Sequence, residues 1–306
     1  MHTPRVLILA PDGWGDPATD YWAPYEAIFF NKIAQEAGAE TKVLRGQDDN
    51  KQNYDEEVKK SDMITGVGHG RDDAFAGFRN QILEQCPVPQ GKYDNKGWFP
   101  VSCEVGQRLA PEIVEKSKNA ASIGETTLYY FYANPTAIHK GEDPEKEDPY
   151  IASFIIPEVK FRVAILGGMR LADAYQVMLT AYEEEAKKWE NKEPDVADTL
   201  RYDATFRKKF GNDDWRLPGT QPPPQPPQCD YTCAICGYKA KDATDLTNHV
   251  FNVHSKTVEK HNCPFCNYEA KNTDDLKQHI LTVHLAPCKL RDWLRKSLGC
   301  PIEKLK

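Results

Sequence analysis

The chain has 306 residues, of which 40% are hydrophobic and 28% are charged, and its formal net charge at pH 7 is -7. This length allows one substantial domain and one or two small ones, and the ordinary composition names no partner. No apolar run is long enough to cross a membrane, and residues 1–13 lack the basic and apolar regions of a secretory signal. We therefore expect a cytoplasmic protein without a membrane partner.

Residues 1–210 alternate short apolar runs with amphipathic stretches, which is typical of an α/β domain with a mostly parallel sheet between helical layers. One further strand should begin at Pro100, because proline cannot donate to a ladder. The other predicted strands cover residues 6–10, 42–44, 63–68 and 120–124.

Apolar spacing predicts two helices in the same region, and residues 150–166 fit either a strand or a helix. The first helix covers residues 23–37 and the second covers residues 171–187. Their inward faces should carry Tyr25, Ile28, Phe29 and Ile33 in the first, and Leu171, Tyr175, Met178 and Tyr182 in the second.

Two chemically reactive residues follow predicted strands. His69 stands between two glycines directly after the strand at 63–68, and Cys103 follows the strand around Pro100. Carboxyl ends of parallel strands share one edge of a sheet, so we expect the two side chains to converge there. A thiol beside an imidazole and near a helix beginning around Gln107 can ionise and act as a nucleophile.

The residues around this pair suggest further roles. Gly70 would let the backbone approach a substrate carbonyl, so that its N–H and that of Cys103 form an oxyanion hole. His69 would protonate the leaving amine and later activate water. The flanking carboxylates Asp72, Asp73, Glu104 and Glu125 could form an acidic pocket or be solvated, and Trp98 and Tyr129 could line a pocket or belong to the core.

The motifs VGHG and VSCEVG resemble those of the caspase-like (clan CD) cysteine peptidases, in which a strand ends in His-Gly and a later strand is followed by Cys. The gingipain and CHAT branch is the most similar, through a Cys-x-x-Gly turn, a following strand that ends at Gly124, and the segment GGMRLADAY. The resemblance covers about residues 3–190. It implies a three-layer caspase-like domain with Cys103 as nucleophile, His69 as acid and base, and Gly70 as an oxyanion contact.

Other enzyme classes fit less well. GVGHGR is not a GxGxxG motif and follows the third predicted strand, which disfavours a dinucleotide-binding fold. The flavodoxin-like amidotransferase superfamily remains an alternative, because its members also place a cysteine on a strand-to-helix turn. Their histidine normally follows the cysteine, however, and here His139 lies in a charged loop that we expect to be solvated surface.

The composition changes at residues 211–228, where a proline-rich stretch predicts a semi-rigid linker. A thirty-residue repeat follows, with two cysteines, a twelve-residue spacer and two histidines in each copy. This spacing resembles tandem ββα zinc fingers at residues 229–256 and 257–286, followed by a tail at 287–306. Each finger should bind one structural Zn²⁺, and the eight ligands are Cys233, Cys236, His249, His254, Cys263, Cys266, His279 and His284.

The helix positions that read bases in this zinc-finger family favour a protein partner over nucleic acid. They hold Asp242, Asp245 and Asn248 in the first finger, and Asn272, Asp275 and Gln278 in the second. None is an arginine that could read guanine, and aspartates repel phosphate. We therefore expect a cysteine endopeptidase whose fingers recruit a protein substrate or regulator. The alternative from another class is a catalytically idle zinc-finger adaptor or a nucleic-acid-binding regulator.

Overall fold

The computed structural model describes residues 2–221, 237–239 and 249. The chain divides into two units, Met1–Pro223 and Pro224–Lys306, and the fold described below belongs to the first. Apart from residues 237–239 and 249, the predicted zinc fingers and the tail lie outside the described residues. None of the helices in the described part combines the length and apolar composition that a membrane crossing requires.

The first unit is an α/β fold around a six-stranded sheet in the order β2-β1-β3-β7-β8-β9. Adjacent strands are parallel except for β9, which runs antiparallel to β8. The sequence therefore predicts the mostly parallel sheet correctly, but it missed β9. The strands are β1 (Arg5–Ala10), β2 (Glu40–Arg45), β3 (Met63–Val67), β7 (Gly97–Val101), β8 (Ala121–Glu125) and β9 (Arg207–Gly211).

One face of the sheet is covered by α4 (Lys51–Lys60) and α5 (Leu109–Glu115), beside a small antiparallel sheet. That small sheet comprises β4 (His69–Arg71), β5 (Ala74–Ala76) and β6 (Ile82–Gln85). The apolar core on this face contains side chains of the large sheet, the small sheet and the two helices. Its main members are Leu7, Leu9, Tyr54, Val58, Ile64, Phe75, Leu83, Trp98, Leu109 and Ile113. Burial of these side chains fixes the register of the parallel strands, because a one-residue slip would turn them to the other face.

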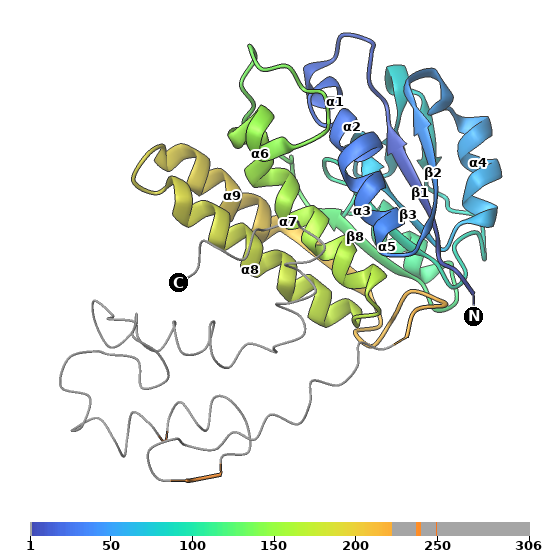
Figure 1. The fold of residues 1–306 in the computed structure, drawn as a ribbon. Helices are drawn as coiled ribbons and strands as arrows, with labels where there is room; N and C mark the ends of the chain where they lie inside the picture. The colour runs from blue at the N-terminus through green and yellow to red at the C-terminus, as the bar shows by residue number, and fades with distance from the viewer. Residues whose placement is uncertain (1, 222–236, 240–248, 250–306) are drawn as a thin grey trace. The chain divides into compact units, whose positions relative to one another are not determined.

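The remaining elements of the unit are mostly helices. Figure 1 shows α7 (Pro149–Leu166), α8 (Leu171–Trp189) and α9 (Pro194–Phe206) side by side. Helix α8 contacts both α7 and α9. Phe161 of α7 meets Phe99 of β7 edge to face, with ring centroids 5.1 Å apart. Residues 150–166, which fit either structure, are thus helical. The shorter helices are α1 (Pro17–Asp20), α2 (Ala23–Tyr25), α3 (Asn31–Glu36) and α6 (Pro144–Glu147).

The predicted helix at residues 23–37 exists, but its inward face is partly wrong. A π-helical turn at Glu26–Phe30 separates α2 from α3 and adds a residue to that turn. The rotation buries Phe30 completely and leaves Ile28 37% exposed. In α8 the expected face is confirmed for Leu171, Met178 and Tyr182, which are buried.

Pro100 lies inside β7 and does not begin it, contrary to the prediction. The strand pairs with β3 along its whole length but with β8 only at Gly97 and Trp98. The missing N–H of Pro100 would point toward β8, and β7 no longer pairs with β8 at this position, so no ladder hydrogen bond is lost. Its carbonyl oxygen there accepts a hydrogen bond from Arg207 at 3.1 Å.

The predicted linker begins later than residue 211. Trp215 and Leu217 are 2% and 1% exposed, and the Trp215 indole donates to the Asn119 carbonyl at 3.0 Å. The Trp215 ring also lies 5.7 Å from that of Phe99. The first unit thus includes residues from the start of the predicted linker, because Trp215 and Leu217, which precede the first proline of that stretch, are buried.

Candidate active site

The register of two central strands brings the predicted residues together. Val67 of β3 pairs with Val101 of β7, and the N–H of Gly68 donates to the Val101 carbonyl at 3.1 Å. His69 and Cys103 each stand two residues beyond this pair. They therefore leave the sheet side by side, at its carboxyl edge, as the sequence predicts.

The close approach of the two motifs explains the glycine after the histidine. A Cβ atom on Gly70 would lie 2.2 Å from Ser102 Oγ and 2.3 Å from the carbonyl oxygen of Cys103. Neither distance is sterically allowed, so only glycine permits this contact. The backbone N–H of Cys103 itself donates no hydrogen bond within the described residues, so it remains available to a ligand.

His69 has a carboxylate partner that sequence reasoning missed. Its Nε2 lies 2.5 Å from Asp16 Oδ2, and the ring is half-buried. Asp16 is itself held in place, because it caps the N-terminus of α1 and its Oδ2 accepts from the Thr19 hydroxyl at 3.0 Å. Trp14 meets the His69 ring edge to face, with centroids 6.3 Å apart.

A signal for Asp16 does exist in the sequence. An aspartate directly before a proline is typical of a helix start, and this one follows the first strand. In a parallel sheet the loop after that strand opens at the same edge as the loop after its neighbour. The pairing of β1 with β3 therefore places the loop containing Asp16 beside His69.

A tight turn follows Cys103. Glu104 adopts a φ of 55°, and its N–H donates to the Thr127 carbonyl at 2.8 Å. Gly106 packs against Gly124 so closely that a Cβ on Gly106 would lie 2.6 Å from the Gly124 carbonyl oxygen. The two glycines that carry part of the sequence resemblance are thus required by one backbone contact. The predicted helix after the turn is confirmed as α5, which begins at Leu109.

The thiol of Cys103 is bound by the backbone of Tyr129. The Cys103 thiol donates to the Tyr129 carbonyl oxygen, with Sγ and the oxygen 3.9 Å apart. The same Sγ accepts a hydrogen bond from the Tyr129 N–H at 3.4 Å. Burial raises the pKa of Cys103, the Tyr129 N–H lowers it, and the carboxyls of Glu104, Glu125 and Asp203 raise it. Within the described residues, no hydrogen bond joins this thiol to His69, and its partner is the Tyr129 backbone.

Two buried carboxyls lie behind the thiol with too little positive charge to pair them. Glu125 and Asp203 are fully buried, and burial raises their pKa values to about 8 and about 9. The nearby Arg207 is committed to Glu158 through two hydrogen bonds, at 3.1 and 2.9 Å. Both carboxyls are therefore mostly neutral at pH 7, as expected for buried carboxyls without a cationic partner of their own.

The other predicted flanking residues have different fates. Asp73 pairs with Arg71 at 2.6 Å and Asp72 is exposed, so neither joins Glu125 in an acidic cluster. Trp98 belongs to the core, where its indole donates to the Tyr54 hydroxyl at 3.1 Å. The ring of Tyr129 points inward, since its hydroxyl bonds to that of Tyr182 at 2.9 Å.

The expectation that His139 is solvated surface is wrong. Its side chain is 5% exposed, and Nε2 lies 3.0 Å from Asp148 Oδ2. The ring also stacks on Tyr21, with centroids 4.7 Å apart. The charged loop folds over this pair because Glu147 accepts four backbone N–H groups from residues 140–143. His139 is thus committed to a structural pair, which removes the histidine that an amidotransferase would need.

Of the eight predicted zinc ligands, only His249 is among the described residues. Its ring stacks on that of Tyr238, with centroids 4.0 Å apart. The other seven, Cys233, Cys236, His254, Cys263, Cys266, His279 and His284, lie outside the described residues.

Comparison with known proteins gives structural similarity at low sequence identity. No protein-family model matches the chain, and no curated protein matches it. Among solved structures it is similar to the Arg-specific cysteine proteinase gingipain R (RgpB), with 13% identity over 70% of this chain and a TM-score of 0.43.

A complex of the Porphyromonas gingivalis RgpB pro- and mature domains gives 12% identity, 70% coverage of this chain and a TM-score of 0.47. Caspase-1 from Spodoptera frugiperda gives 10% identity, 69% coverage of this chain, 86% coverage of its own and a TM-score of 0.42. The chain spans about half of the two gingipain chains, 47% and 48%.

Proposed function

We propose that the first unit is a caspase-like cysteine endopeptidase in which Cys103 is the nucleophile and His69 the acid and base. One observation carries this proposal: the His69–Gly70 and Ser102–Cys103 backbones leave adjacent parallel strands in register and touch at Gly70. A histidine and a cysteine that diverge from a sheet edge by chance have no reason to require a glycine at their contact.

The chemistry follows from these positions. His69 accepts the proton of the Cys103 thiol, and the thiolate attacks the carbonyl carbon of the scissile peptide bond. The resulting oxyanion accepts hydrogen bonds from the N–H groups of Gly70 and Cys103. The protonated imidazole gives its proton to the leaving amine, which leaves a thioester on Cys103. Water, deprotonated by His69, then releases the acid product.

Asp16 sets the state of the imidazole. Because Nε2 donates to its carboxylate at 2.5 Å, Nδ1 is the nitrogen that exchanges a proton with the thiol. The negative charge also stabilises the imidazolium that forms when the thiol ionises. Asp16 is thus a positioning residue that acts through His69.

The cysteine and histidine repeat supports a second part of the proposal: two structural zinc fingers that bind a protein substrate or regulator. The proline-rich stretch would tether a docked protein near the peptidase unit and raise its local concentration. Deleting residues 229–306 tests this part. Cleavage of a short peptide should survive the deletion, while cleavage of a docked protein should be lost.

Labelling of the thiol tests the peptidase. Wild type and Cys103→Ala are incubated with acyloxymethyl ketone peptides that differ in the residue before the ketone, and adducts are detected by intact-protein mass spectrometry. Labelling of wild type alone supports the proposal, with Cys86→Ala as a matched control that should still label. If iodoacetamide alkylates Cys103 but no peptide labels wild type or a variant in which the contact between Tyr129 and Cys103 is released, the assignment as a peptidase is wrong.

One observation favours a second candidate, the catalytically idle adaptor. The Cys103 thiol is paired with the Tyr129 backbone and not with His69. An adaptor would cleave no peptide in either the full-length or the truncated form. It would still bind its partner through the fingers.

A further inference from the structure

The segment that contacts the half-buried thiol of Cys103 is held by several hydrogen bonds. Residues 126–130, named here the strap, follow β8 and carry the Tyr129 peptide that contacts Cys103. Thr126 donates to the Phe206 carbonyl through both its N–H and its hydroxyl, each at 3.0 Å. The Thr127 hydroxyl lies 3.0 Å from the hydroxyl of Tyr202. Both partners belong to α9.

Asp203 supplies the anchor next to the thiol contact. Its Oδ1 accepts from the N–H of Tyr130 at 3.2 Å, one residue beyond the peptide that holds Cys103. Oδ2 is buried and has no hydrogen-bond partner within the described residues. The neighbours of Asp203 are Glu125 of β8, Glu158 of α7 and Arg207 of β9. Since its pKa is raised to about 9, it holds Tyr130 as a neutral carboxylic acid at pH 7.

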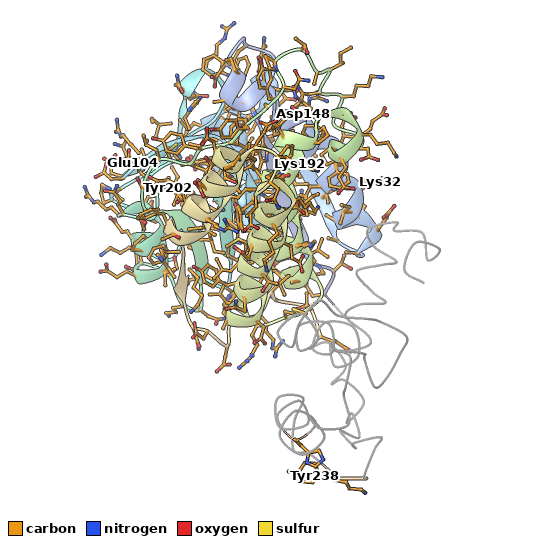
Figure 2. All side chains as sticks on the ribbon, turned by 90° about the vertical axis from the view of Figure 1, so that its left-hand side faces the viewer. Lys32, Glu104, Asp148, Lys192, Tyr202 and Tyr238 are labelled. Carbon is orange, nitrogen blue, oxygen red and sulfur yellow. The ribbon has the colours of Figure 1, made fainter. Side chains whose placement is uncertain are left out.

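The strap is also hydrogen-bonded to the turn after Cys103. The Thr127 carbonyl accepts the Glu104 N–H at 2.8 Å, while the Thr127 side chain reaches Tyr202. Figure 2 shows Glu104 and Tyr202 on the same side of the molecule, which agrees with their shared partner. The strap is therefore bonded to the nucleophile turn on one side and to α9 on the other.

We propose that the strap is a built-in latch that keeps Cys103 covered and paired away from His69, and that Asp203 of α9 is the positioning residue that holds the latch closed. The inference rests on the proposed role of Cys103 as nucleophile. With the latch closed, the thiol donates to the Tyr129 carbonyl. Release of the latch exposes the thiol to solvent and to His69, so that it ionises more easily and reacts faster.

The balance of effects on the thiol gives the expected direction. The hydrogen bond from the Tyr129 N–H stabilises the thiolate and would be lost on release. Burial destabilises the thiolate and is the larger of the two effects, so we expect release to lower the pKa of Cys103. The carboxyl of Glu104 also opposes ionisation, and those of Glu125 and Asp203 do so at the pH values at which they are charged. A release that lowers the thiol pKa by one unit raises the thiolate fraction about tenfold below that pKa.

Alkylation of Cys103 by iodoacetamide tests the latch without assuming a substrate. Rates are measured on the full chain between pH 6 and pH 10, with the Cys103 peptide quantified by mass spectrometry. Asp203→Ala removes the acceptor for Tyr130 and should raise the rate at pH 7 about tenfold. Asp203→Asn keeps a neutral acceptor and should stay within about twofold of wild type. Asp198→Ala, at an exposed position on the same helix, should not change the rate.

A second pair of variants tests the same latch if Asp203→Ala does not fold. Thr127→Val and Tyr202→Phe break one hydrogen bond from opposite sides. Each should raise the alkylation rate, and the double variant should add little to either single one. Wild-type rates in Asp203→Ala, Thr127→Val and Tyr202→Phe would overturn the latch.

The two proposals can fail separately. Faster alkylation in the released variants, without labelling of any form by the ketone peptides, supports the latch and rejects the peptidase. Ketone labelling of wild type at the same rate as every released variant, with unchanged alkylation, rejects the latch and supports the peptidase.

Discussion

Each reactive side chain at the candidate site has its chemical state set by one neighbour. Asp16 fixes His69 through Nε2, and the Tyr129 peptide occupies the thiol of Cys103. Gly70 is required because it has no side chain: a Cβ atom there would clash with Ser102 and Cys103. These are local contacts, so single substitutions can address them one at a time.

Replacing Asp16 by Asn should slow the reaction while leaving the fold intact. The amide keeps the size of the side chain but loses the charge that stabilises the imidazolium and selects its tautomer. We expect the rate of ketone labelling of Cys103 to fall by at least about 10²-fold. Asp48→Asn, at an exposed position after β2, is the matched control. Equal labelling rates for Asp16→Asn and wild type would contradict the role given to Asp16.

Replacing Glu125 by Gln should stabilise the protein at neutral pH. The folded-state pKa is raised from 4.5 to about 8, so the unfolded chain ionises first and stability falls as pH rises between those values. Gln removes this loss, which is about 3 kcal/mol at pH 7 and vanishes near pH 4.

Urea unfolding of wild type and Glu125→Gln at pH 4, 5.5 and 7 measures the difference. A gap between the two proteins that widens with pH is expected. A constant gap would mean that the titration of Glu125 is not its source.

Contacts between elements explain why some predictions from sequence succeeded. The parallel strands were recognisable because both of their faces are covered, which makes them continuous apolar runs such as VLILA. His69 and Cys103 could be placed at one edge of the sheet because each follows the end of a strand. These features depend on local pattern and on general rules of topology.

Other features depended on tertiary contacts that no local pattern records. The π-helical turn that exposes Ile28 and the break in pairing that tolerates Pro100 are both of this kind. Asp16 lies far from His69 in sequence, and β9 carries Arg207, Lys208 and Lys209, which do not resemble a buried strand. Such a strand forms because Arg207 finds Glu158 inside the protein.

That ion pair between β9 and α7 should be costly to break. Arg207 and Glu158 are 0% and 1% exposed, so Glu158→Ala would leave a buried charge without its partner. We expect a loss of about 3–5 kcal/mol in the free energy of unfolding. Glu184→Ala removes the partner of Lys160 at a site where the carboxylate is 56% exposed, and should cost about 0.5 kcal/mol or less. Urea unfolding curves for both variants compare the two directly, and similar losses would show that burial is not decisive.

The whole chain divides into two units, and the second contains the cysteine and histidine repeat. The unit ends near Pro223 and not at residue 210, because Trp215 and Leu217 complete its core. A protein of residues 1–223 should therefore unfold with the same urea midpoint as the first transition of the full chain. Residues 1–210 alone should be less stable by about 3–5 kcal/mol. Equal midpoints for the two fragments would show that residues 211–223 add nothing to the core.

The register of β3 and β7 has a consequence for how relatives of this protein can be recognised. His69 and Cys103 each lie two residues beyond the same strand pair, Val67 and Val101. The chain between them passes through the small three-stranded sheet and a connection at residues 86–96. Insertions there would lengthen the interval between the two motifs without moving either residue. A search that fixes the number of residues from histidine to cysteine will therefore miss true relatives. A search that fixes each residue's offset from the end of its own strand should find them.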